Sequence, residues 1–266
     1  MITNEKNARI FQNTENMYKS NKTLAEAVKK SNNAQAVIKE GQKLPPLSQP
    51  PNQGGNKIIV SKKRSFEAAE QYKDKKVCVL NFASSVNPGG GVRSGAGAQE
   101  ECLCRCSTLY ASLTYWTALK AFYKPHQENR HYLHTDDIIY TPDVVVFKSD
   151  TDSPALRAQN EWFKVNVITC AAPKLRHVVS VNHSELEALF EKRIRRIARV
   201  AALYENEVLI LGAFGCGAFM NPPEVVARAM KKALDAENRF ETVEIAVYCR
   251  PGRDMTNYRA FADAFK

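Results

Sequence analysis

The sequence predicts a three-layer α/β/α sandwich, in which helices cover both faces of a mostly parallel sheet. Two observations lead to this prediction: short runs of consecutive apolar residues recur along the chain, and segments with helical spacing of apolar residues alternate with them. Strands that are apolar at every position are typical of parallel sheets buried between helices. The chain has 266 residues, with 44% hydrophobic and 25% charged, which excludes a disordered or fibrous protein.

The first part of the chain is polar and contains no apolar run. Its few apolar side chains recur about three and four residues apart, which indicates helices; they are Ile10, Phe11, Met17, Tyr18, Leu24, Val28, Val37 and Ile38. They are too sparse to form a core, so we expect the first forty or so residues to pack on a larger domain. Residues 43–56 are rich in Pro and Gly and form a linker or surface loop. We therefore expect a helical extension with its linker at 1–56 and an α/β domain at 57–266.

Predicted strands and helices alternate from residue 57 onward. The strands are 57–61, 77–82, 144–147, 165–170, 208–214 and 244–249, and the helices are 65–72, 99–123, 184–203, 222–237 and a last one through Phe261 and Phe265. Ser184 is the expected N-cap of its helix, with Glu187 completing a capping box. Prolines open the helix at 222, as their fixed backbone angle favours.

Charge and cysteine content limit the partners and the compartment. Lys and Arg outnumber Asp and Glu by 38 − 28 = 10, which favours polyanionic partners, although a basic proteome or a solubility role explains the surplus equally well. No stretch reaches the roughly 18 apolar residues that a membrane span needs, and Met1–Lys6 does not resemble a secretory leader. Seven cysteines, an odd number, argue against a complete disulfide framework, so we expect a cytoplasmic protein.

Two glycine-rich loops directly follow predicted strands. The first, NFASSVNPGGGVRSGAGAQEE, begins at Asn81 and enters a helix at Gln99, Glu100 and Glu101. The second, LGAFGCGAFMNPP, begins at Leu211 and allows a run of inward-pointing N–H groups that suits a diphosphate. Ligands of open α/β sheets bind at the carboxyl ends of strands, so we expect both loops at one sheet edge. Together they predict a nucleotide-diphosphate cleft with a catalytic carboxylate.

The residues of these loops resemble those of the poly(ADP-ribose) glycohydrolase family. The triple glycine, short spacer and Gln-Glu-Glu of NPGGGVRSGAGAQEE are similar to the family signature, in its compact bacterial-type branch, and LGAFGCGAFMNPP resembles the family's diphosphate-binding loop. VITCAAPKL and EIAVYC are also similar, so the likeness runs from about Asn56 to the C-terminus. It implies a macrodomain-like core with a mixed, mostly parallel sheet, and a catalytic domain at 57–266.

The resemblance also implies a reaction and a role for each site residue. Glu101 is the expected general acid and base that cleaves the ribose–ribose O-glycosidic bond, Glu100 holds the distal ribose, and the substrate diphosphate stabilises the oxocarbenium-like transition state. Phe219 is expected to orient the distal ribose, while Phe214, closer to its strand, is expected in the core. The expected ADP-ribose-binding residues are Asn81, Asn87, Gly89, Gly90, Gly91, Val92, Gln99, Gly215, Cys216, Gly217, Ala218 and Phe219.

Three other groups of residues have structural interpretations that we favour. Cys102, Cys104 and Cys106 suit buried apolar positions better than a zinc site, because Cys104 points away from the other two on a helix. His131, His134, Asp136 and Asp137 suit a solvated loop better than a metal site. The basic run Lys192, Arg193, Arg195, Arg196 and Arg199 is typical of a solvated helix face, or guides a polyanion toward the cleft.

The expected activity is thus exo-acting hydrolysis of poly(ADP-ribose) that releases ADP-ribose, without a metal or cofactor, by a monomer with no membrane association. ADP-ribosylated protein or nucleic acid are further candidate partners. Two alternatives stay open: a hydrolase of mono-ADP-ribose on protein or DNA, and a non-catalytic ADP-ribose reader. The intact Glu101 argues against the reader, which has no need of a catalytic acid.

Overall fold

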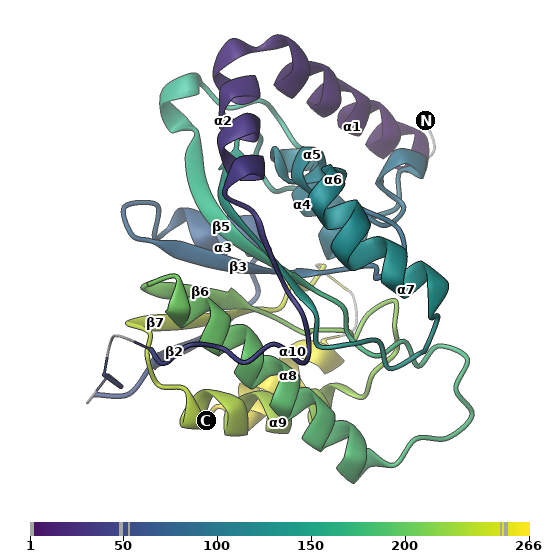
Figure 1. Ribbon diagram of the computed structural model, residues 1–266, viewed down its shortest axis with the longest axis vertical. Coiled ribbons are helices and arrows are strands. Elements are labelled where there is room, and N and C mark those ends of the chain that lie inside the picture. The colour runs from purple at the N-terminus through teal and green to yellow at the C-terminus, as the bar shows by residue number, and fades with distance from the viewer. Residues whose placement is uncertain (1–2, 48–49, 53, 251, 253–254) are drawn as a thin grey trace. The chain divides into compact units, whose positions relative to one another are not determined.

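The computed structural model describes residues 3–47, 50–52, 54–250, 252 and 255–266 (Figure 1). The chain forms two compact units, each assembled from separate segments. The first unit contains Met1–Glu40, Asn81–His131 and Asp137–Ala171, and the second contains Gly41–Leu80, Tyr132–Asp136 and Ala172–Lys266. Among the described helices, none combines the length and the apolar character that crossing a membrane requires.

The first unit carries an antiparallel set of strands and most of the short helices. Strand β4 (Ile138–Val146) pairs with β1 (Ala36–Ile38) on one side and with β5 (Phe163–Cys170) on the other. A bulge between Thr141 and Val144 accommodates Asp143, which has a positive φ of 54°. The helical segments are α1 (Thr3–Ser20), α2 (Lys22–Asn33), η1 (Val92–Ser94), α4 (Gln99–Cys106), α5 (Leu109–Leu113), α6 (Trp116–Ala118), η2 (Leu119–Tyr123), α7 (Lys124–Glu128) and η3 (Gln159–Glu161).

The second unit carries the parallel strands. They pair in the order β3 (Val77–Phe82), β6 (Val208–Leu211), β7 (Thr242–Ala246) and β2 (Lys57–Ser61), and the last two residues of β3 belong to the first unit. The helices of this unit are α3 (Ser65–Glu70), α8 (His183–Leu203), α9 (Pro223–Ala236) and α10 (Thr256–Ala264). The described strand pairs are thus both antiparallel and parallel, and helices accompany them in each unit, which confirms the predicted α/β fold class.

The N-terminal helices are part of the first unit rather than a free extension. Tyr18 and Leu24 are buried in a cluster with Val145 and Phe147 of the β4 region, and Met17 and Val28 pack against it. The helical prediction for this segment is wrong at its end, because Ala36–Ile38 form strand β1 on the edge of β4. A three-residue edge strand is too short to produce a periodic signal of its own.

The predicted long helix 99–123 is wrong, because it is broken after Cys106. Ser107 has extended backbone angles and forms a bridge with Val146. The Thr108 N–H donates to the carbonyl of Val145, whose N–H donates to Thr108 Oγ1, both at 3.0 Å. These bonds to the end of β4 replace the helical ones, and the chain resumes as the shorter segments α5, α6, η2 and α7.

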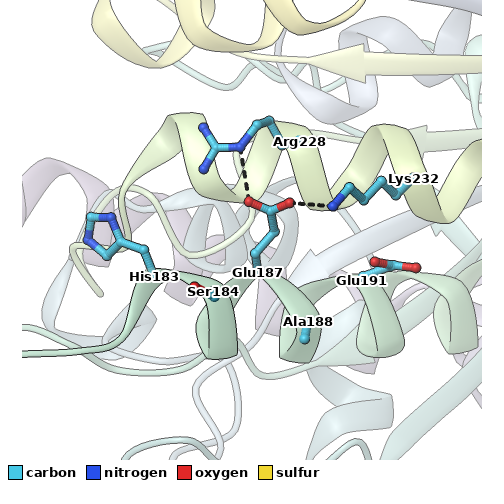
Figure 2. A pocket seen from close by; sticks show the side chains of 7 residues that line it. All are labelled: His183, Ser184, Glu187, Ala188, Glu191, Arg228 and Lys232. Carbon is cyan, nitrogen blue, oxygen red and sulfur yellow. Dashed lines mark hydrogen bonds and ion pairs between the residues drawn. The ribbon is translucent and has the colours of Figure 1, made fainter.

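Other element boundaries differ from those predicted. Strand β4 begins six residues earlier than the predicted 144–147, β6 ends at Leu211 rather than at 214, and β7 ends at Ala246 rather than at 249. The cap of α8 is Asn182 and not Ser184, since the Asn182 side chain accepts from the Ser184 N–H. Glu187 forms no capping box and bridges instead to Arg228 at 2.9 Å and Lys232 at 2.8 Å on α9 (Figure 2).

The basic run on α8 is not one solvated face. The Arg193 side chain is buried, and its Nε donates to Asp136 Oδ1 at 2.6 Å, while its Nη1 donates to the Leu133 carbonyl at 3.0 Å. Lys192 lies 2.8 Å from the second oxygen of Asp136. Burial acts to raise the pKa of Asp136, but the two cations outweigh it and lower that pKa below its ordinary value. The expectation of a solvated loop at Asp136 is therefore wrong.

We predict that Arg193→Leu lowers the free energy of unfolding by about 3–5 kcal/mol, because it leaves the Asp136 carboxylate buried without its principal partner. Arg195→Gln on the same helix is the matched control. Arg195 is exposed and pairs with Glu237 at 3.3 Å, so its loss should cost less than about 1 kcal/mol. Urea unfolding followed by circular dichroism measures both, and equal losses would contradict the assignment.

Candidate active site

Two consecutive glutamates stand in the first turn of α4, next to the end of β3. Glu100 and Glu101 are only 3% and 7% exposed. Buried carboxylates are costly unless hydrogen-bond donors surround them. The N-terminal turn of a helix favours negative charge, but the specific donors come from the loop between β3 and α4.

Glu100 is held from both sides by groups near the end of β3. Its Oε2 accepts from the Ser84 N–H at 2.8 Å, and its Oε1 accepts from Asn81 Nδ2 at 3.3 Å. Asn81 is fully buried, and its amide also donates to Thr169 Oγ1 of β5 at 3.2 Å. Asn81, predicted as a substrate-binding residue, therefore positions Glu100 in this structure.

Glu100 is also the carboxyl group with the strongly perturbed acidity. Burial raises its pKa to about 8, and the neighbouring Glu101 carboxyl acts in the same direction. Hydrogen bonds from the Ser84 and Gly89 N–H groups and from the Asn81 amide oppose the rise without cancelling it. A pKa raised in this way favours the protonated form of Glu100 at neutral pH.

Glu101 has one occupied and one unoccupied carboxyl oxygen. The Gly91 N–H donates to its Oε1 at 2.9 Å. Its Oε2 is buried and has no hydrogen-bond partner among the described residues. An orphaned buried oxygen on an otherwise anchored carboxyl group is typical of a site where a ligand supplies the missing partner.

The triple glycine is required by the approach of the loop to these carboxylates. Gly90 has φ of +58°, and a Cβ at that position would overlap with Glu101 Oε1 and lie 3.2 Å from Glu100 Oε2. Gly89 has φ of +68°, and a Cβ there would lie 2.6 Å from Cδ2 of Tyr110. The Gly90 N–H donates to the Asn87 carbonyl at 2.9 Å, so the glycine N–H groups are engaged within the loop and with the carboxylates.

The remaining predicted residues of this loop have structural surroundings of different kinds. The Gln99 side-chain oxygen accepts from the Phe82 N–H at 2.9 Å and so joins α4 to the end of β3. Val92 is buried, whereas Asn87 is exposed. Asn87 thus remains accessible to a ligand, while Val92 and Gln99 hold the loop in place.

Sequence reasoning missed Tyr123, which lies near the glutamate pair. Its hydroxyl is buried, has no hydrogen-bond partner in the described part of the chain, and interacts electrostatically with Glu100. Burial raises the pKa of this phenol well above its usual value. It lies at the end of the π-helical segment η2, and such segments are frequent at functional sites. A broken helix gives no sequence signal for this placement.

The second loop, Gly212–Asn221, belongs to the second unit. Gly215 has φ of +79°, and a Cβ there would lie 2.5 Å from Cβ of Ala172 and 2.7 Å from Nδ2 of Asn221. Asn221 closes the loop, since its Nδ2 donates to the carbonyls of Gly215 at 2.9 Å and Pro173 at 2.7 Å. These two hydrogen bonds from the Asn221 side chain hold the turn in shape.

The N–H groups of this loop are directed differently from those of the first. Within the described residues, the backbone N–H groups of Gly217, Ala218 and Phe219 form no hydrogen bond with the protein, while the Cys216 N–H donates to the Ala213 carbonyl at 3.0 Å. Successive backbone N–H groups without a protein acceptor are typical of loops that bind a phosphate. Gly217 and Ala218 are exposed.

The aromatic and thiol groups of the second loop have distinct surroundings. Phe214 is fully buried against Phe190, which confirms its predicted place in the core. Phe219 is only partly buried, 6.0 Å from the ring of His134. Burial raises the pKa of the Cys216 thiol, which argues against its use as a nucleophile. Cys102, Cys104 and Cys106 are buried, as expected for apolar positions.

Comparison with known families places this chain. The family described as microbial-type PARG, catalytic domain, matches residues 4–149, which is more than half of the chain. The comparison with curated proteins finds no match. The chain belongs to the microbial-type PARG family.

Solved structures of two bacterial poly(ADP-ribose) glycohydrolases (PARG) are similar to the whole chain. The enzyme from Thermomonospora curvata has 28% sequence identity and a TM-score of 0.84, covering 98% of this chain and 100% of that one. Its complex with the inhibitor ADP-HPD has a TM-score of 0.83 and 28% identity, covering 97% and 99%. The enzyme from Deinococcus radiodurans in complex with ADP-ribose has 32% identity and a TM-score of 0.76, covering 90% and 97%.

We predict that Gly90→Ala destabilises the chain by about 1–3 kcal/mol, because the added Cβ strains a positive φ and displaces the Glu101 carboxyl. Gly41→Ala is the matched control, since a Cβ at Gly41 meets no atom within 4 Å and its φ is not positive. Thermal unfolding of the two variants measures the difference. A Gly90→Ala variant as stable as Gly41→Ala would mean that the loop does not lie against Glu101.

We predict that Glu100→Gln changes how stability depends on pH. Between pH 4.5 and about 8, the folded chain retains a proton on Glu100 that the unfolded chain has released. Stability contributed by this group therefore falls as pH rises through that range. The variant cannot titrate, so its melting temperature relative to wild type should increase from pH 5 to pH 8.

Glu26→Gln, which removes an exposed carboxylate from α2, controls for the loss of one negative charge. Calorimetric melting at several pH values provides the comparison. If the Glu100→Gln and wild-type curves stay parallel, the Glu100 carboxyl does not keep its proton in the folded chain.

Proposed function

We propose that this chain hydrolyses the ribose–ribose O-glycosidic bonds of poly(ADP-ribose), with Glu101 as general acid and base. Membership of the microbial-type PARG family supports the reaction. The observation that supports the role of Glu101 is its asymmetric carboxyl group: the Gly91 N–H anchors Oε1, whereas Oε2 is buried without a partner among the residues that the structure describes. A carboxyl group held in this way presents one oxygen in a fixed direction.

In the proposed reaction, Glu101 first donates a proton and later accepts one. Glu101 gives its proton to the departing oxygen as the bond to the anomeric carbon breaks through an oxocarbenium-like state. A water molecule then adds to the anomeric carbon, and Glu101 accepts the proton that the water loses. The net change is one water consumed and one ADP-ribose unit released, which is the exo-acting form of the reaction.

Glu100 is proposed to bind the distal ribose rather than to transfer protons. A neutral carboxylic acid both donates and accepts a hydrogen bond, which suits a ribose hydroxyl. Its pKa of about 8 keeps it in this form at neutral pH. Asn81 and Ser84 hold it in position, and the exposed Asn87 is a candidate direct contact.

The loop Gly212–Asn221 is proposed to bind the substrate diphosphate. The three N–H groups of Gly217, Ala218 and Phe219 without a protein acceptor support this role. A diphosphate bound there carries negative charge that can stabilise the sugar cation. Partly exposed Phe219 is proposed to orient the distal ribose. ADP-ribose bound to the Deinococcus radiodurans enzyme supports the ligand class.

We propose a macrodomain-like catalytic domain at 57–266 that works as a monomer with the 1–56 segment packed on it. Seven cysteines, an odd number, support a reducing compartment such as the cytoplasm. A net charge of +10 supports polyanionic partners, including ADP-ribosylated protein or nucleic acid.

We predict that Glu101→Gln abolishes ADP-ribose release from poly(ADP-ribose), because an amide cannot donate the required proton, while ADP-ribose still binds. Calorimetric titration with ADP-ribose and a chromatographic release assay measure the two properties. The same assay with mono-ADP-ribosylated protein and ADP-ribosylated DNA separates the alternatives. Release from those substrates alone would favour a mono-ADP-ribose hydrolase, and binding without release from any substrate would favour a reader.

A further inference from the structure

Helix α1 contacts the glycine loop directly. The Asn7 side-chain amide donates to the Gly95 carbonyl at 3.1 Å. Gly95 has φ of +80°, and a Cβ there would overlap with the backbone of Asn4, so the loop and the helix touch without an intervening side chain. The contact between α1 and the segment before α4 therefore depends on the Asn7 amide in the helix and on the missing side chain of Gly95 in the loop.

Arg93 is the principal link between the helix and the loop. Its Nη1 and Nη2 donate to the two carboxyl oxygens of Glu15 on α1, at 3.0 and 2.9 Å. Its Nε donates to the Tyr110 hydroxyl at 2.9 Å, and its guanidinium lies over the rings of Tyr110 and Phe11. The Glu15 side chain is only 11% exposed. Paired hydrogen bonds of this kind fix orientation as well as distance.

The constraint at Arg93 is transmitted to Glu101 over two residues. Arg93 lies in η1, and the carbonyl of Gly91 accepts from the N–H groups of Ser94 and Ala96, both at 3.1 Å. The Val92 N–H donates to the Gly89 carbonyl at 3.1 Å. These bonds hold 89–96 in a tight turn. The Gly91 N–H of this turn is the donor that anchors Glu101 Oε1.

We propose that Glu15 and Arg93 are positioning residues for the glycosidic reaction, which makes the N-terminal helix part of the catalytic apparatus. The proposal rests on the proposed function, in which Glu101 is the acid and base. The Glu15–Arg93 pair fixes the turn, the turn fixes the Gly91 N–H, and that N–H fixes the direction of the Glu101 carboxyl. Loss of the pair changes the position of the reacting oxygen and leaves the hydrogen bonds of Ser84 and Asn81 to Glu100 in place.

The test compares Glu15→Gln and Arg93→Gln with wild type in steady-state hydrolysis of poly(ADP-ribose). We expect kcat to fall about tenfold in each, because catalysis depends steeply on the placement of the reacting group. KM should change less than twofold. The double variant should be no slower than the slower single variant, because the two residues act through one contact.

Lys19→Gln is the matched control. Lys19 pairs with the same Glu15 carboxylate at 3.4 Å, but it is exposed on α1 and forms none of the bonds that hold the turn. We expect its kcat to equal that of wild type. A tenfold fall in Lys19→Gln as well would show that any change around Glu15 impairs the enzyme, and would overturn the assignment to the Glu15–Arg93 pair.

The outcomes separate this proposal from the proposed function. If wild type releases no ADP-ribose, the proposed function fails and this proposal fails with it. If wild type is active and both variants keep its kcat, the positioning role alone is overturned. The same holds if kcat falls, KM rises and the melting temperature drops together. If Glu15→Gln does not fold, Arg93→Lys, which keeps the charge but not the two-pronged contact, is judged by the same criteria.

Discussion

The structure of the first unit depends on the burial of two adjacent carboxyl groups in the first turn of α4. Placing Glu100 and Glu101 out of water is unfavourable unless donors replace the lost hydration. The chain supplies them from one short loop, with the Ser84 N–H on Glu100 and the Gly91 N–H on Glu101. The backbone can come this close only because Gly90 has no side chain. The glycines therefore allow the backbone donors to reach the two buried carboxyl groups.

The surrounding elements make this close approach rigid. The break in the helix after Cys106 lets Tyr110 pack beneath Gly89 and accept a hydrogen bond from Arg93. An uninterrupted helix would carry the chain past these positions. On the other side of the loop, α1 contributes Glu15 and Asn7. The loop is therefore held both by Tyr110 and by helix α1.

The glycine-rich loop of the second unit, Gly212–Asn221, is held by a side-chain amide. There the turn is closed by Asn221, whose amide donates to the Gly215 and Pro173 carbonyls. Successive N–H groups of the loop have no acceptor in the part of the protein that the structure describes. Nearby in this unit, the buried Arg193–Asp136 pair joins α8 to the segment Tyr132–Asp136. The N–H groups of Ser84 and Gly91 in the first loop are thus donors to carboxyl groups, whereas the second loop keeps its shape through the amide of Asn221.

The sequence by itself determined the fold class, the positions of both loops and the placement of Glu100 and Glu101 at the start of a helix. These features depend on residues close together in the chain, so apolar runs, glycines and helix-start patterns reveal them. Only the tertiary structure decided that Arg193 is buried while Arg195 is exposed, that the helix breaks at Ser107, and that burial raises the pKa of Glu100. The first two depend on partners distant in sequence, Asp136 and Val145, and the third depends on burial of the carboxyl group by the folded chain, which no local pattern identifies.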